Sequence, residues 1–181
     1  MEKDNQIDPK PDYKKISHTA YLVAFLKTFG SVPFAEETGR LSGCEEFMQK
    51  TNPEGYKHML QLAPMFEARY HVITDNLRNR GIEQVLETAV GVSPRGIDMT
   101  ADPKIDYLAT DLPDMLIEQE RISKAILASH GYERPNLRFM PVDVLNRAQM
   151  KEAIKSFDQN KPLGVISEGL FLVSSTCLGD L

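Results

Sequence analysis

Apolar residues in the first part of the chain recur at intervals of three and four positions, which is the period of an amphipathic helix. The pattern predicts a helix over residues 17–29, with Ser17 or Thr19 as its N-cap. A second short segment follows Pro33, and the helical period returns over residues 53–79, with Pro64 as a candidate break. We therefore expect this part of the chain to be helical and to contain no strand.

The pattern changes after Gly81, where short apolar runs alternate with helical segments. The runs cover residues 84–90, 105–112, 137–144 and 163–172, and helices are expected over residues 113–130 and 147–157. This alternation predicts right-handed βαβ units and a parallel sheet. The expected fold class is therefore α/β, an open parallel sheet of about four strands preceded by an N-terminal helical cap. The expected domains are a flexible tail over residues 1–15, a helical cap or lid over residues 16–81 and a sheet domain over residues 82–181.

Composition and charge exclude several classes of protein. The 181 residues include 21 Lys and Arg against 26 Asp and Glu, a net charge of −5, whereas a nucleic-acid surface needs clustered excess cations. The two cysteines, Cys44 and Cys177, have no paired metal-ligand spacing and cannot form a disulfide framework. The charged N-terminal segment is not a signal peptide, and no apolar run has the roughly 20 residues that span a bilayer. We expect a cytoplasmic protein with no metal site and no nucleic-acid or membrane partner.

Each predicted strand delivers a carboxylate near its carboxyl end: Glu87, Asp111, Asp143 and Glu168. Open parallel sheets bind ligands beyond the carboxyl ends of their strands, so these side chains are expected along one rim. A carboxylate there accepts hydrogen bonds from ribose hydroxyls or from an adenine amine. Each one alone is better explained as a solvated strand end or a helix N-cap. Their recurrence over four strands is what indicates a ligand site.

The loop GVSPRG, from Gly91 to Gly96, narrows the class of ligand. It is not a P-loop, because Ile97 follows Gly96 in place of lysine. It is not the dinucleotide fingerprint either, because Ser93 replaces the second glycine, and this argues against a nucleotide-dependent oxidoreductase. Asp111 follows Gly91 by 20 residues, the offset of a ribose-binding acid. The spacing favours a nucleoside ligand without a phosphate-binding loop.

Six segments extend this picture over residues 17–172: HTAYLVAFLKTFGSVPFAEE, FEARYHVITDNL, ETAVGVSPRGIDMT, YLATDLPDM, FMPVDV and GVISEGLFL. In this order they resemble class I S-adenosylmethionine-dependent methyltransferases of the leucine carboxyl methyltransferase-like group, which includes O-methyltransferases of polyketide biosynthesis. SPRGIDMT with TDLPDM is the most specific pair. The resemblance implies a Rossmann-like sheet domain and S-adenosylmethionine as cofactor. It also implies methyl transfer to an oxygen, carboxylate or hydroxyl, of a small-molecule or peptide-carboxyl acceptor.

The resemblance implies roles for the residues that match its motifs. Gly91 is similar to the glycine beneath the amino-acid end of the cofactor, and Asp111 to the acid that binds the ribose hydroxyls. Asp143 and Val144 resemble the pair that contacts the adenine. Glu87 belongs to the expected cofactor-binding set and is expected to orient the glycine loop rather than to touch substrate. No catalytic residue is identified.

Three further residues resemble the group that surrounds the methionine part of the cofactor. Glu168 resembles a glutamate near this part, Arg69 resembles an arginine that binds its carboxylate, and Lys27 lies where a second basic residue would help. Local alternatives stay open at this point. Arg69 can pair along its helix with Glu67 or Asp75, and Lys27 can be a solvated helix residue.

Other polar residues near the motifs have structural explanations. Arg95 and Asp98 are expected to form a local pair that holds the loop, rather than to take part in catalysis. Tyr70 and His71 lie beside Arg69 as candidates for an acid and a base. A helical aromatic residue and a lone histidine are more often packing or surface residues, so we favour that interpretation.

The sequence departs from the group after GLFLV, where the group continues toward further strands of a seven-stranded sheet and this chain gives SSTCLGDL. We therefore expect a truncated or frameshifted product in which residues 163–172 form an unpaired, apolar edge strand. Self-association or a partner chain is expected to cover this edge. The alternative function is a non-catalytic remnant or binding module of the group.

Overall fold

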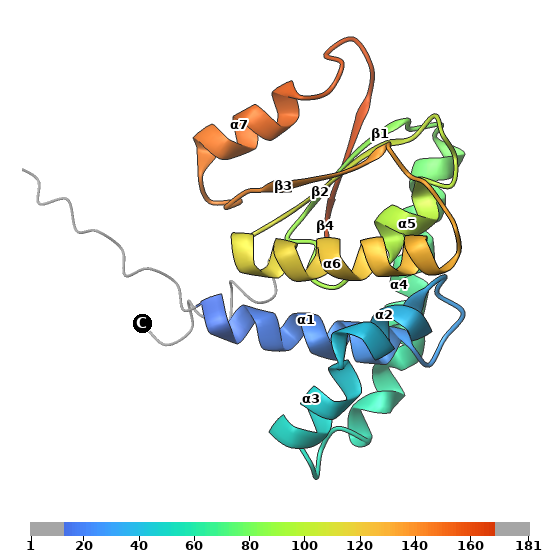
Figure 1. Cartoon of the computed structure of the whole chain (residues 1–181), viewed down its shortest axis with the longest axis vertical. Coiled ribbons are helices and arrows are strands. Elements are labelled where there is room, and N and C mark those ends of the chain that lie inside the picture. The colour runs from blue at the N-terminus through green and yellow to red at the C-terminus, as the bar shows by residue number, and fades with distance from the viewer. Residues whose placement is uncertain (1–12, 169–181) are drawn as a thin grey trace, which may run out of the picture.

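The computed structural model describes residues 13–168, with side chains from residue 18 onward (Figure 1). The elements before the sheet are α1 (Tyr13–Lys27), α2 (Ala35–Ser42), α3 (Cys44–Thr51), the 3-10 helix η1 (His58–Leu62) and α4 (Ala63–Asn79). The elements that follow are β1 (Gln84–Thr88), α5 (Arg95–Met99), β2 (Asp106–Asp111), α6 (Pro113–Ser129), β3 (Leu137–Pro141), α7 (Arg147–Lys155) and β4 (Leu163–Ser167).

The four described strands form one all-parallel sheet in the order β3-β2-β1-β4. Gln84 of β1 is paired with Asp106 of β2 on one side and with Leu163 of β4 on the other. The chain therefore moves outward from β1 through β2 to β3 and then crosses back to place β4 beside β1. Open α/β sheets bind ligands at such a reversal of winding, beyond the carboxyl ends of the strands. The expected α/β class with a parallel sheet is confirmed, and the architecture is compatible with a Rossmann-like fold.

Helices cover both faces of the sheet, as the burial of parallel sheets requires. One face carries Val85, Tyr107 and Ile166, and joins α5, α6 and the N-terminal helices in one continuous apolar cluster. The other face carries Leu86 and Leu108, and packs against α7 and the residues that follow it. Figure 1 shows α7 on one side of the sheet and α6 on the other, with the N-terminal helices beyond α6.

Several element boundaries differ from the sequence-based expectation. α1 begins at Tyr13, so residues 13–15 are helical rather than part of a tail, and neither predicted N-cap residue starts the helix. β1 ends at Thr88 because Ala89 has a left-handed φ of 50°, which interrupts the extended chain. α5 forms inside the stretch that was expected to be a loop, and it begins at Arg95.

The helical character of the segment before the sheet is confirmed, since residues 13–80 contain helices and turns but no strand. The helical stretch over residues 53–79 is interrupted near Pro64, as expected, because η1 ends at Leu62 and α4 begins at Ala63. Two helices follow Pro33 where one short segment was expected. The predicted tail over residues 1–12 and the part of the predicted fourth strand beyond Glu168 lie outside the described residues. None of the helices in the described part combines the length and apolar character that a membrane crossing needs.

β4 is an edge strand of the described sheet, because it pairs with β1 on one side only. Its sequence, LGVIS, has no charge and no proline, and Val165 is 56 % exposed. Such edges are usually protected by charges, prolines or a covering element. The expected edge strand is therefore confirmed over Leu163–Ser167.

Candidate functional site

The candidate site lies at the carboxyl ends of β1 and β4, where the winding of the sheet reverses. β1 contributes Glu87, and β4 leads directly into Glu168. Since side chains alternate between the faces of a strand, both carboxylates lie on the face that packs against the N-terminal helices. Arg95, the first residue of α5, lies between them and donates to both. The strand order thus brings together carboxylates that are far apart in the sequence.

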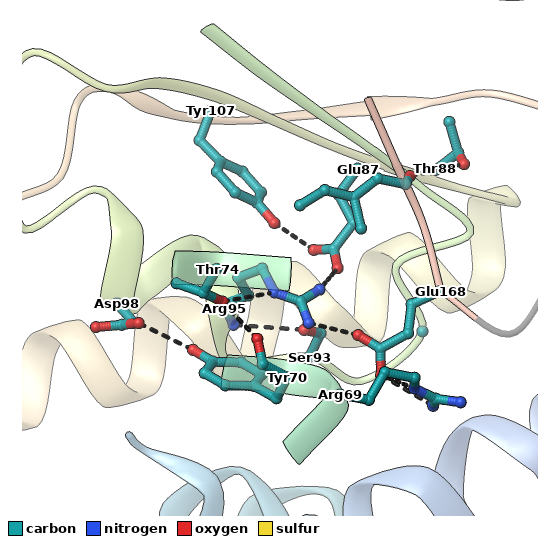
Figure 2. Close-up of polar contacts among 12 residues, drawn as sticks. Arg69, Tyr70, Thr74, Glu87, Thr88, Ser93, Arg95, Asp98, Tyr107 and Glu168 are labelled. Carbon is teal, nitrogen blue, oxygen red and sulfur yellow. Dashed lines mark hydrogen bonds and ion pairs between the residues drawn. The ribbon is translucent and has the colours of Figure 1, made fainter. Parts of the chain in front are cut away.

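Arg95 is the centre of this cluster, as Figure 2 shows. Its side chain is fully buried: Nη1 donates to Glu87, Nη2 donates to Glu168, and Nε donates to Thr74 Oγ1 at 3.2 Å. Tyr107 donates its hydroxyl to the other oxygen of Glu87. Loss of any one partner leaves another buried polar group without compensation, because no solvent replaces it. We call the five ionic residues Lys27, Arg69, Glu87, Arg95 and Glu168 the Arg95 cluster.

Lys27 and Arg69 complete the cluster at Glu168. Lys27 Nζ lies 3.1 Å from Glu168 Oε1, and Arg69 donates to the same oxygen from Nε at 3.1 Å and from Nη2 at 2.9 Å. The side chain of Lys27 is only 3 % exposed, so the alternative of a solvated helix residue is wrong. Among the described residues, the ion pair of Arg69 reaches across the fold to Glu168, and not to Glu67 or Asp75 on its own helix.

The Arg95 cluster has one positive charge in excess, because three cations face two carboxylates. Burial by itself raises the pKa of Glu168, but the three cations outweigh burial and hold the pKa at about 2. Burial lowers the pKa of Lys27, in spite of the neighbouring Glu168. Burial and the carboxylate of Glu87 raise the pKa of Tyr107, which therefore stays neutral. A desolvated excess of positive charge is suited to an anionic group of a ligand.

Tyr70 packs against the cluster and connects it to α5. Its ring centroid lies 4.7 Å from the guanidinium carbon of Arg95 and 5.4 Å from Lys27 Nζ, both cation–π distances. Its hydroxyl donates to Asp98 at 3.0 Å, and burial followed by the charge of Asp98 raises its pKa. Asp98 also accepts from Arg78 at 3.0 Å. The predicted local pair of Arg95 with Asp98 is therefore wrong, because each has partners from other elements.

Tyr70 and His71 do not form an acid–base pair in the structure. The hydroxyl of Tyr70 is directed to Asp98, whereas Nε2 of His71 lies 3.4 Å from Ser31 Oγ at an exposed position. The interpretation of these two residues as packing and surface residues is confirmed.

The glycine loop and the end of β2 form the second part of the site. Asp111 is the last residue of β2, and its carboxylate accepts from the backbone N–H groups of Gly91 and Leu112, both at 2.7 Å. Gly91 has a left-handed φ of 57°, and a Cβ on it would lie 3.1 Å from Cβ of Ala20, so the backbone and the close approach of α1 both favour glycine. Burial raises the pKa of Asp111, and the two N–H groups oppose this rise. The carboxylate keeps lone pairs for further donors.

Asp143 and Val144 lie in the turn between β3 and α7. Oδ1 of Asp143 accepts from the N–H of Leu145 at 2.9 Å, and its own N–H donates to Gln149 at 2.7 Å. The sheet order separates them from β4 by two strands. The four predicted carboxylates therefore do not form one row. Glu87 and Glu168 share the guanidinium of Arg95, and Asp111 binds the glycine loop. Asp143 lies apart from them, in the turn after β3.

The sequence analysis missed the residues that hold the cluster: Arg95 as a shared partner, Thr74, Tyr107 and the packing role of Tyr70. One signal was available. β1 is buried along its whole length, and a carboxylate in such a strand needs a cation or other donors. The presence of Glu87 within the apolar run 84–90 therefore points to a buried cation, and Arg95 is the next one along the chain.

In the part of the chain that the structure describes, no group of three or more His, Cys, Asp and Glu side chains is arranged to hold a metal ion. Neither the protein-family models nor the curated proteins compared with this chain match it. The feature of the described fold that points to a ligand is the reversal of the sheet, where a buried cationic cluster lies near a glycine loop held by a carboxylate.

Proposed function

We propose that this chain is an S-adenosylmethionine-dependent O-methyltransferase acting on a carboxylate or hydroxyl of a small-molecule or peptide-carboxyl acceptor. The observation that carries the proposal is the buried excess of positive charge at the β1–β4 reversal, next to Asp111 and the glycine loop. S-adenosylmethionine joins an amino-acid end to a nucleoside, so it has groups complementary to both parts of the site. The motif resemblance supplies the class of reaction.

In this proposal Lys27 and Arg69 bind the carboxylate of the cofactor, and Glu168 binds its ammonium group. Asp111 accepts hydrogen bonds from the ribose hydroxyls, using the lone pairs that the backbone N–H groups leave. Gly91 is assigned to the loop beneath the amino-acid end of the cofactor, and its left-handed φ of 57° shapes that loop. The donor set of the site therefore fits the charge pattern of the cofactor.

Asp143 and Val144 are assigned to the adenine, at the part of the rim formed by β3. Glu87 acts indirectly, because Arg95 and Tyr107 occupy its carboxylate oxygens. The cofactor supplies an activated methyl group on a sulfonium. The chain has to align an acceptor oxygen behind that methyl group and exclude water. A carboxylate acceptor needs no general base, whereas a hydroxyl acceptor needs a group that takes its proton.

The first test is a calorimetric titration of S-adenosylhomocysteine into the wild-type chain, into Arg69→Met and into Arg121→Met. Arg121 is the matched control, because it is an ion-paired arginine on the exposed surface of α6. We expect wild type and Arg121→Met to bind equally, and Arg69→Met to bind about tenfold more weakly through loss of a charged contact. Absence of binding by a folded, monodisperse wild-type sample would reject the proposal. Methyl transfer to small acids and phenols is the second test.

β4 pairs on one side only within the described sheet, and this apolar edge favours a second candidate, a binding module that keeps the ligand site without transferring a methyl group. For both candidate functions we propose that this edge pairs with a second copy or with a partner chain. Both also imply a cytoplasmic location. Binding of S-adenosylhomocysteine without transfer to any acid or phenol would favour the module. Light scattering measures whether the chain self-associates.

A further inference from the structure

The two oxygens of Glu168 have different partners. Oε1 lies 3.1 Å from Lys27 Nζ and accepts a hydrogen bond from Arg69 Nη2 at 2.9 Å. Oε2 accepts a hydrogen bond from Nη2 of Arg95. In the proposed function, Lys27 and Arg69 bind the carboxylate of the ligand. Arg95 is not shared with the ligand in that arrangement, so its bond to Oε2 is the one that keeps Glu168 in place.

Arg95 is itself fixed from several elements. Glu87 of β1 and Thr74 of α4 accept from its side chain, and its guanidinium stacks on Tyr70 at 4.7 Å. Tyr107 of β2 holds Glu87 in turn. The guanidinium therefore has no freedom to follow a ligand, and it connects the end of β4 rigidly to β1, β2 and α4 (Figure 2).

We propose that Arg95 is a positioning residue that holds the carboxylate of Glu168 in place for a cationic group of the ligand while Lys27 and Arg69 bind the anionic group. This inference depends on the proposed function. It adds that Arg95 keeps the affinity for the ligand from falling when the pH is lowered. Arg95 acts through Glu168 and does not itself touch the ligand.

The proposal has a consequence that a purely structural role lacks. The charged groups that face Glu168 are Lys27 of α1, Arg69 of α4 and Arg95 of α5, with Glu87 on the far side of the guanidinium. Together the three cations hold the pKa of Glu168 at about 2, against the effect of burial. Without Arg95, only Lys27 and Arg69 oppose the effect of burial, so the pKa of Glu168 rises, and acid neutralises its carboxylate more readily and weakens its bond to a cationic group.

The experiment is a titration of S-adenosylhomocysteine at pH 7 and at pH 5 into wild type, Arg95→Met, Arg95→Lys and Arg138→Met. Both pH values lie between the ordinary pKa values of an α-carboxyl and an α-amino group. The carboxylate of the ligand therefore stays negative and its ammonium group stays positive in both titrations. Arg138 is the matched control, because it pairs with both oxygens of Asp106 and stacks on Phe157 at 4.9 Å, at the other end of the sheet. Circular dichroism establishes that each variant is folded.

We expect wild type and Arg138→Met to bind with similar affinity at both pH values. Arg95→Met should bind about tenfold more weakly at pH 7, the scale of one lost charged contact, and several-fold more weakly again at pH 5. Arg95→Lys, which keeps the charge but not the two-sided fork, should fall between them at pH 7. If Arg95→Met does not fold, the affinities of Arg95→Lys and wild type at the two pH values test the proposal.

Two results would overturn the inference. One is a folded Arg95 variant that binds as wild type does at both pH values. The other is a loss of affinity in Arg95→Met that is the same at pH 7 and pH 5, since that indicates a structural role only. Failure of wild type to bind is a different outcome, because it rejects the proposed function itself.

Discussion

Replacement of Lys27 by methionine tests the charge balance of the Arg95 cluster most directly. Lys27 and Glu168 form one ion pair with side chains only 3 % and 8 % exposed, yet the two residues should respond in opposite ways. Lys27→Met leaves two cations with two carboxylates, so no buried charge loses compensation. Glu168→Gln leaves three cations with one carboxylate, so the buried Lys27 loses its ion-pair partner, as does Arg69, whose side chain is 27 % exposed.

The expected magnitudes differ by several kcal/mol. Burial lowers the pKa of Lys27, which means that keeping its charge at neutral pH costs stability in the folded state. Exchange of a whole buried ion pair for apolar side chains is often neutral or stabilising by about 1 to 4 kcal/mol, whereas a buried charge left without a partner costs about 3 to 5 kcal/mol. Lys27→Met leaves Glu168 paired with Arg69 and Arg95, so it avoids the second cost. In a chain of this size about 1 kcal/mol shifts the melting temperature by roughly 2 to 4 °C. Lys27→Met should therefore melt at or above the wild-type temperature, and Glu168→Gln should melt roughly 6 °C or more below it.

The assay is thermal unfolding at pH 7 followed by circular dichroism, with Lys124→Met as the control for loss of an exposed lysine. Lys124 is 71 % exposed in its pair with Glu120, so its loss should change stability by at most about 0.5 kcal/mol. In spite of its stability, Lys27→Met should bind S-adenosylhomocysteine about tenfold more weakly, because the cluster loses its excess positive charge. Destabilisation of Lys27→Met as large as that of Glu168→Gln would refute the reasoning.

Three further predictions concern the rest of the site. Asp111→Ala should weaken binding of S-adenosylhomocysteine by about 1 to 3 kcal/mol in a calorimetric titration, and an unchanged affinity would contradict the ribose role. Gly91→Ala should lower the free energy of unfolding in urea by about 1 to 2 kcal/mol, because φ is 57° and the new methyl group would lie 3.1 Å from Ala20; an unchanged midpoint would show that α1 yields at no cost. The pKa of Glu168 is about 2 in the folded chain against an ordinary 4.5, so its stabilisation is complete above pH 4.5 and is lost as the pH falls toward 2. An acid titration should show this loss in wild type, and Glu168→Gln should have a flatter profile over the same range.

Local sequence patterns predicted the element types of this protein well. The apolar period and the alternation of short runs with helices predicted the α/β class, and the runs that begin at residues 84, 137 and 163 coincide with the starts of β1, β3 and β4. The ends of the strands were less accurate. β1 stops two residues early because Ala89 takes a left-handed φ, which nothing in an apolar run of QVLETAV indicates.

The resemblance and the strand-end argument also selected residues that the fold brings together. Lys27 of α1 and Arg69 of α4 both lie within 3.1 Å of the carboxylate of Glu168, the residue that follows β4. Asp111 and Gly91, separated by 20 residues, are joined by a hydrogen bond. Asp111 and Glu168 were found because chemistry and spacing mark the carboxyl ends of strands, whichever way the sheet is ordered, whereas Lys27 and Arg69 were found through the resemblance alone.

Only the tertiary structure decided how these side chains are partnered. The order β3-β2-β1-β4 places Glu168 beside Glu87, and the burial of both requires the shared guanidinium of Arg95. Reasoning from helix neighbours gave Arg95 to Asp98 and left Lys27 in solvent, because a local pattern contains no information on which distant element covers a residue. Sequence periodicity reports the face on which a side chain lies, whereas the partner of a buried charge is set by strand order and by the loss of water, and both arise only when the chain is folded.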